Sequence, residues 1–167
     1  SILTMFYNPV IWSGENQLSA DTIRFYIIDS ANITVHLLKA GFIVSSLYDE
    51  TEFNQIKGLN IIGYILNQEL RQVDVNGNAE CLYYIVEEDS SLIGINSSAT
   101  SEMRIFLTNN EVNSITFFNA PDGILHPDEM LTRKERFLKG FQWLSQYRAV
   151  TPLDIFHTPI PRSKSNY

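Results

Sequence analysis

The sequence predicts an all-β protein built from repeated antiparallel hairpins, and three observations support this fold class. Short runs of β-branched and aromatic residues recur along the chain and are separated by clusters of Asn, Asp, Gly and Ser. No long stretch of residues 1–126 carries apolar residues at helical spacing. Three of the runs can be superimposed at a nearly constant separation, which is typical of stacked supersecondary units. With 167 residues, 44% of them hydrophobic, the chain can bury a core.

The superimposable runs form the first strand of each unit, over residues 20–27, 59–66 and 100–107. In this alignment Phe25, Tyr64 and Ile105 correspond, at separations of 39 and 41 residues. A polar turn follows each run, at residues 29–32, 67–69 and 108–111. A returning strand then carries a pair of apolar residues, namely Val35 and Leu37, Val73 and Val75, and Ile115 and Phe117. A third element begins after residues 39–41, 77–79 and 119–121.

Alternation along a strand assigns these residues to faces, because successive side chains of a strand point to opposite sides. We call the shared apolar face the apolar wall. Its predicted members are Ile23, Phe25, Ile27, Val35, Leu37, Ile62, Tyr64, Leu66, Val73, Val75, Met103, Ile105, Leu107, Ile115 and Phe117. The opposite face carries Arg24, Gly63 and Arg104 but also apolar residues, so the register stays ambiguous. The apolar wall is either an open groove or the core of a closed sandwich.

The character of the sequence changes after residue 126, so we divide the chain into a β-repeat domain (1–126) and a C-terminal tail (127–167). Thr132 and Glu135 have the spacing of a capping box, which predicts a short helix over 133–139 that ends near Gly140. The prolines that follow predict an extended segment. Aromatic residues alternate with basic ones in the tail, and we expect them to cover one open end of the β-body. Its cations then face solvent or pair with an anion, either a neighbouring module or lipid phosphate.

Charge is distributed unevenly along the chain. Residues 1–131 hold 5 Lys/Arg and 17 Asp/Glu, a net charge of −12, whereas residues 132–167 hold 7 and 2, a net charge of +5. An acidic body repels phosphates, so we expect no nucleic-acid partner. No apolar run approaches the ~20 residues that span a bilayer, so no transmembrane segment is predicted. Residues 1–7 also lack the features of a signal peptide.

Residue patterns that support catalysis are sparse. His36, His126 and His157 are far apart and show no metal-ligand spacing. No phosphate-binding loop, nucleophile elbow or dinucleotide-binding motif occurs. Cys81 has no nearby His and is expected to be a small buried hydrophobic residue, and the acidic residues 87–89 lack the spacing of a calcium loop. The sequence therefore predicts a protein that is not an enzyme, with no metal site and no cofactor.

A family resemblance is carried by four stretches, at residues 9–23, 53–58, 73–79 and 138–141. They resemble the OstA-like proteins of the Bacteroidetes type, which are relatives of the periplasmic lipopolysaccharide-transport protein A. The pair Ala20-Asp21 before a strand and the triplet Gly77-Asn78-Ala79 after one are typical of the repeat in that family. The corresponding residues 39–41 and 119–121 depart from the triplet, with Lys-Ala-Gly and Asn-Ala-Pro.

The resemblance implies an open, twisted β-jelly-roll whose apolar interior holds the acyl chains of lipid A. It further implies a periplasmic location, a role in outer-membrane biogenesis, and a lipid-binding role for the apolar wall. The expected partners are lipopolysaccharide or lipid A, and copies of the chain or other lipopolysaccharide-transport proteins stacked end to end. Residues 2–7 are expected to be the last strand of an earlier unit, in a C-terminal portion of a longer protein.

Two further function classes stay open beside lipid transport. A structural or adaptor module would stack through its exposed sheet edges without binding lipid, and a closed core would favour it. A lipid-modifying hydrolase would need a cleft with convergent polar groups.

Overall fold

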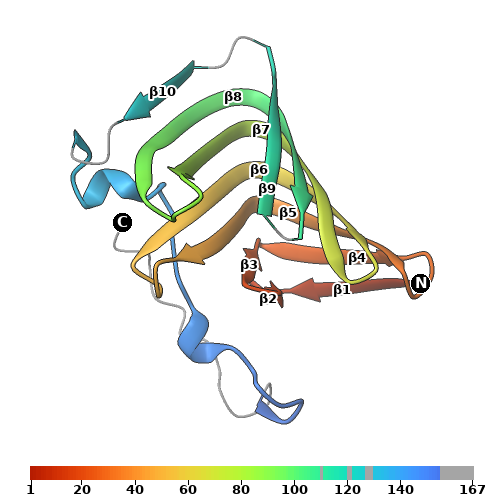
Figure 1. The fold of residues 1–167 in the computed structure, drawn as a ribbon. Helices are drawn as coiled ribbons and strands as arrows, with labels where there is room; N and C mark the ends of the chain where they lie inside the picture. Colours follow the sequence, from red (N-terminus) through yellow and green to blue (C-terminus); the bar gives the residue numbers. More distant parts are fainter. Residues whose placement is uncertain (110, 120–121, 127–129, 155–167) are drawn as a thin grey trace.

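The computed structural model describes residues 1–109, 111–119, 122–126 and 130–154. Within these ranges ten strands form one antiparallel sheet that is open and twisted, which confirms the predicted all-β class (Figure 1). The strands are β1 (Ile2–Phe6), β2 (Val10–Ser13), β3 (Asn16–Ser19), β4 (Thr22–Ile27), β5 (Asn32–Leu47), β6 (Glu52–Leu66), β7 (Glu69–Val86), β8 (Leu92–Thr108), β9 (Glu111–Phe118) and β10 (Asp122–His126).

The sheet is mainly a meander in which each strand pairs with its neighbour in sequence. Strands β5, β6, β7 and β8 are long and lie side by side in that order. At one edge, β4 and β3 pair with successive parts of β5. At the other edge, β9 and β10 pair with successive parts of β8. The two ends of the long strands therefore form two halves of one sheet.

A line of β-bulges separates these halves. Lys39 and Ala40 of β5 stand opposite the single residue Leu59 of β6, and residues 77–78 of β7 stand opposite Ser101 of β8 in the same way. Lys39, Ala40, Gly77 and Asn78 all have positive φ angles, between 47° and 83°. A bulge bends its strand and increases the local twist. Because the bulges lie at one level, the sheet curves strongly there, as Figure 1 shows for β5 to β8.

We call the half that contains β1, β4 and β9 the first layer, and the half that contains β2, β3 and β10 the second layer. The side chains that point between the layers form the main core. In the first layer they make two rows across the strands. One row is Met5, Ile23, Leu37, Ile61, Val75, Met103 and Phe117. The other is Phe25, Val35, Gly63, Val73, Ile105 and Ile115, with the exposed Leu3 in register at its end.

The predicted register is wrong in the second repeat unit. Ile62, Tyr64 and Leu66 were assigned to the apolar wall, but they point away from the core, and Tyr64 and Leu66 are exposed. Ile61 and Gly63 take the inward positions instead. Gly63, and not Tyr64, is therefore in register with Phe25 and Ile105.

Polar residues on the neighbouring strands explain this register. Ile62 lies between His36 and Asp74, so an inward Ile62 would carry both of these groups into the core, at a cost that unpaired burial makes large. Burial alone would raise the pKa of Asp74, but hydrogen bonds from Arg104 and Gln72 on the outer face hold it below its usual value. Gly63 suits the inner face because a Cβ there would lie 2.8 Å from Cγ1 of Val35.

Replacing Ile61 and Ile62 by threonine, in two separate variants, tests this register. We expect Ile61→Thr to lower the free energy of unfolding by about 2–4 kcal/mol, because Ile61 is fully buried and the hydroxyl finds no water. We expect Ile62→Thr to cost less than about 1 kcal/mol, because its side chain lies on the outer face. Urea denaturation of both variants measures the difference. The opposite ranking would restore the register expected from the sequence.

The short helix predicted over 133–139 is present only as a single 3-10 turn. The structure has one 3-10 turn there, η2 (Lys134–Arg136), and a second, η3 (Ser145–Tyr147). The capping box itself is confirmed, because the Thr132 backbone N–H donates to Oε2 of Glu135 at 2.7 Å and the Glu135 N–H donates to Thr132 Oγ1. Gly140 has a φ of +95°, the left-handed conformation expected at the end of the segment. The chain stays extended because its aromatic residues pack on the sheet instead of on a helix.

The tail covers the outer face of the second layer, and not an open end of the body. Phe141 is buried against Phe42, Val44 and Phe53, with Phe137, Leu138 and Trp143 around it. The centroid of the Phe141 ring lies 5.0 Å from that of Phe53 and 4.6 Å from that of Phe137. A second cluster of Leu82, Tyr84 and Ile95 packs against Leu131 and Leu138. The second layer is thus apolar on both faces, and the tail shields the outer one.

Two buried glutamines fasten the tail to the sheet. The Gln55 amide donates to the Arg136 carbonyl and accepts from the Leu138 N–H, both at 2.8 Å. Gln17 makes the same pair of bonds, to the Gln142 carbonyl and from the Leu144 N–H, also at 2.8 Å. Each amide therefore pairs with the tail backbone much as a neighbouring strand would. Because both glutamines are 1% exposed, the bonds are sheltered from water.

Two arginines of the tail, Arg133 and Arg136, form ion pairs with the β-repeat domain. Arg133 pairs with Glu52 at 2.8 Å and donates to the Thr51 carbonyl, and Arg136 lies 3.5 Å from the same carboxylate. Glu52 also accepts a hydrogen bond from the Tyr84 hydroxyl at 2.5 Å. Arg133 and Arg136 therefore help to dock the tail on the sheet.

Candidate functional site

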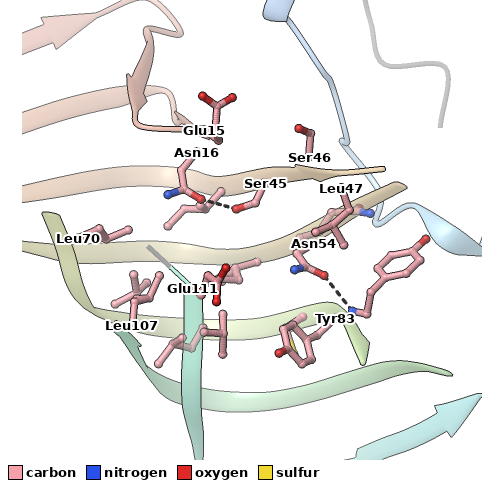
Figure 2. A pocket seen from close by; sticks show the side chains of 18 of the residues that line it. Glu15, Asn16, Ser45, Ser46, Leu47, Asn54, Leu70, Tyr83, Leu107 and Glu111 are labelled. Atoms are coloured by element: carbon pink, nitrogen blue, oxygen red, sulfur yellow. Dashed lines mark hydrogen bonds between the residues drawn. The ribbon is translucent and has the colours of Figure 1, made fainter. Parts of the chain in front are cut away.

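A cavity of about 520 Å³ lies between the two layers. Its apolar lining comes from both layers: Ile43, Ile56 and Cys81 belong to the second, and Leu70, Val73, Ile105, Leu107, Val112 and Ile115 to the first. Figure 2 labels Leu70 and Leu107 among the side chains that line it. Ligand pockets for small molecules commonly have volumes of roughly 300–1,000 Å³ and predominantly apolar linings. The cavity therefore has room for an apolar ligand without a change in the fold.

Polar side chains gather at one end of the cavity, which we call the mouth. It consists of Glu15, Asn16, Ser45, Asn54, Tyr83 and Glu111. The exposed carboxylates of Glu15 and Glu111 mark the side that opens to solvent. The side-chain Oδ1 of Asn16 accepts a hydrogen bond from the Ser45 hydroxyl, and Oδ1 of Asn54 accepts one from the Tyr84 backbone N–H at 2.8 Å. These bonds fix the orientation of both amides (Figure 2).

Charge at the mouth is negative. Burial and the nearby Glu111 carboxylate together raise the pKa of Tyr83, so this phenol keeps its proton at neutral pH. Glu15 has a cationic neighbour, Arg148, at 3.9 Å, but it is 84% exposed, so this pair is weak. Arg148 itself stacks over the Trp12 ring at 5.0 Å. Among the lining residues that the structure describes, none is Lys, Arg or His.

Cys81 lines the cavity with a buried thiol. Burial raises the pKa of the Cys81 thiol to about 11, so the reactive thiolate is scarce at neutral pH. In the part of the chain that the structure describes, no group of three or more His, Cys, Asp or Glu side chains could hold a metal ion. Likewise, none of the described helices is long and apolar enough to cross a membrane.

The structure brings together most of the predicted apolar wall. Ile23, Val35, Leu37, Val73, Val75, Met103, Ile105 and Leu107 are buried in the main core, and Phe25, Ile115 and Phe117 pack against it. Ile27 is half-buried beside Ile33 at the end of β4. Only Val73, Ile105, Leu107 and Ile115 of the predicted set line the cavity. Ile23, Leu37, Val75, Met103 and Phe117 instead form a row of the core closer to the bend.

The sequence interpretation missed Ile43, Ile56, Leu70 and Val112, which line the cavity. Ile43 and Ile56 face each other across β5 and β6 in the second layer. They belong to the stretches that follow or precede a bulge, where no face was assigned. Phe42, Ile43 and Val44 are all apolar and all buried, so alternation alone does not assign a face to Ile43.

Among solved structures, the chain is similar to the crystal structure of LptH from Pseudomonas aeruginosa. That protein is described as the LptA-homologous periplasmic component of the conserved lipopolysaccharide transport device. The TM-score is 0.53 at 12% sequence identity, and the match covers 75% of this chain and 85% of that chain. The likeness shows a shared fold, the β-jelly-roll expected from the sequence. No protein-family model and no curated protein matches the sequence.

Proposed function

We propose that this chain is a lipid-binding module of a lipopolysaccharide transport system in the periplasm, and that it takes part in outer-membrane biogenesis. The cavity between the layers holds acyl chains of lipopolysaccharide or lipid A. The residues that contact them are Ile43, Ile56, Leu70, Val73, Ile105, Leu107, Val112 and Ile115. The family that we propose is the OstA-like one.

The observation that carries this proposal is an apolar cavity inside a fold that LptH shares. Burial of an acyl chain stabilises a complex by about 0.8 kcal/mol per CH₂ group, so a few buried carbons give useful affinity without any catalytic group. Transport also requires release of the lipid. A cavity with few polar contacts binds an acyl chain without holding it in one orientation. The proposed location and activity follow those stated for LptH.

The sheet edges support stacking with copies of the chain or with related transport proteins. Strand β1 pairs with β4 alone among the described strands, and it exposes Ile2, Leu3 and Phe6. Strand β9 pairs with β8 alone at the opposite edge. An unpaired strand edge is a template for another strand. A module that stacks in this way without lipid is the alternative that the following experiment separates.

Filling the cavity tests the lipid-binding role. Val112 lines the cavity from β9 and is half-buried, so Val112→Trp places a ring where acyl carbons would lie. If the ring displaces about two CH₂ groups of the lipid from the cavity, the affinity for the lipid falls by more than about tenfold. The protein is expressed in the periplasm of a Gram-negative host, and native mass spectrometry measures the fraction that carries lipid.

Ser114→Trp is the matched control, because Ser114 is exposed on the outer face of the same strand. We expect this variant to carry lipid like the wild type. Thermal melts of both variants establish that they are folded. A wild-type protein that carries no lipid would favour the stacking module, and an unaltered lipid load in folded Val112→Trp would remove the cavity from the proposal.

A further inference from the structure

The mouth offers both hydrogen-bond donors and acceptors to a ligand. The carbonyls of Asn16 and Asn54 are already bonded, whereas their amide NH₂ groups have no partner among the described residues. The Tyr83 hydroxyl likewise has none in that part of the chain, and it stays protonated beside Glu111. The two amides and the phenol are the donors, and the Glu15 and Glu111 carboxylates are the acceptors.

Such a set matches some polar groups and not others. A sugar hydroxyl donates and accepts at once, so it can donate to Glu111 while it accepts from an asparagine. A phosphate only accepts, and it would bring its negative charge close to two carboxylates in a region that lacks a lining cation. Arg148 lies beside Glu15 but does not line the cavity.

We propose that the mouth selects the polar end of the bound lipid, accepting uncharged sugar hydroxyls and excluding phosphate. This inference rests on the proposed lipid-binding function and specifies the part of the ligand that meets the mouth. A phosphorylated glycolipid would bind with its sugar ring at Asn16, Asn54 and Glu111, and with its phosphate directed away into solvent.

Two amphiphiles with the same twelve-carbon chain test the selection. Dodecyl glucoside and dodecyl phosphate are titrated into the full chain by calorimetry, each below its micelle-forming concentration. We expect the glucoside to bind at least about tenfold more tightly, because like charges brought together at an interface are strongly unfavourable. Added salt should narrow the difference, since it screens the repulsion.

Variants of Glu111 assign the effect to the mouth. Glu111→Gln keeps the shape and removes the charge, so we expect dodecyl phosphate to gain affinity by about tenfold while dodecyl glucoside changes little. Glu102→Gln is the matched control, because Glu102 is exposed on β8 away from the cavity lining. This control should leave both affinities as they are in the wild type.

Each outcome has a definite meaning. If neither amphiphile binds, the proposed lipid-binding function fails and this inference fails with it. If both bind equally well in the wild type, or if Glu111→Gln leaves the affinity for dodecyl phosphate unchanged, lipid binding stands and the selection is overturned. Tighter binding of dodecylammonium than of dodecyl glucoside would also overturn it, because the mouth would then select a cation.

Discussion

Ile105→Asp is expected to unfold the protein at room temperature. Ile105 is fully buried between Val73 and Ile115, where a carboxylate would find no cation and little water. The penalty for an unpaired buried ion is several kcal/mol, and the loss of the isoleucine packing adds about 2–5 kcal/mol. A domain of this size is stable by about 5–15 kcal/mol, so little stability remains. Circular dichroism and urea denaturation measure the outcome.

Phe106→Asp is the control for this experiment. Phe106 is the next residue along β8, but it points to the outer face and is 39% exposed. We expect this variant to stay folded with a loss of about 1 kcal/mol. If Ile105→Asp were as stable as Phe106→Asp, the interior between the layers would be wet, and the core would be an open groove along its whole length.

Deletion of residues 132–167 is expected to cause aggregation, the second large effect. The deletion uncovers Phe42, Val44 and Phe53 on the outer face of the second layer. It also uncovers the cluster of Leu82, Tyr84 and Ile95. A contiguous apolar patch on a sheet surface promotes association. Size-exclusion chromatography with light scattering should show aggregates in place of the species formed by the full chain.

A single substitution measures the same contact without removing the tail. Phe141 is 4% exposed, and Phe141→Ala should lower the free energy of unfolding by about 3–5 kcal/mol, with a drop in Tm of roughly 10 °C. Val150→Ala in the same tail is the control, because Val150 is 90% exposed and should change stability by less than about 0.5 kcal/mol. Equal effects of the two substitutions would mean that the tail is not docked.

Sequence patterns assigned the inward residues of the first and third repeat units correctly, but they assigned the wrong face to the first strand of the second unit. In the first and third units, Ile23 and Ile105 stand in a run where only one face is consistently apolar. The second unit has apolar residues on both faces, with Ile61 and Ile65 on one and Ile62 and Leu66 on the other. The superposition of Tyr64 on Phe25 and Ile105, followed by simple alternation, assigned Ile62, Tyr64 and Leu66 to the apolar wall. The structure instead follows the polar residues of the neighbouring strands, which a single run cannot reveal.

The bulges explain why the cavity was only partly predictable. One residue of β6, Leu59, stands opposite two residues of β5. The inward positions of β6 therefore change from odd to even numbers across the bend, as Ile61 and Ile56 show. In β5 they stay odd, as Leu37 and Ile43 show. Simple alternation holds within each layer, but the pattern of one strand alone does not carry the face assignment from one layer to the next.

The sequence indicated that the tail covers the β-repeat domain, but not which surface it covers. Its alternating aromatic and basic residues indicated a covering segment, and its capping box was correct. The helix failed because Phe137, Phe141 and Trp143 all reach the same sheet surface from an extended chain. The docking partners, Gln17 and Gln55, lie far away in the sequence, and no local pattern marks them as buried.

The glutamine bonds to the tail have a consequence for the order of folding. Most strand pairs of the sheet join neighbours in sequence, so each hairpin can form as soon as its own residues are available. The Gln17 bonds instead join residues 125 and 127 positions apart, and those of Gln55 join residues 81 and 83 apart. Closing such large loops costs entropy that only a finished sheet repays. A nascent chain therefore exposes its outer apolar surface until the tail has been synthesised, and until then this surface is free to associate with other chains.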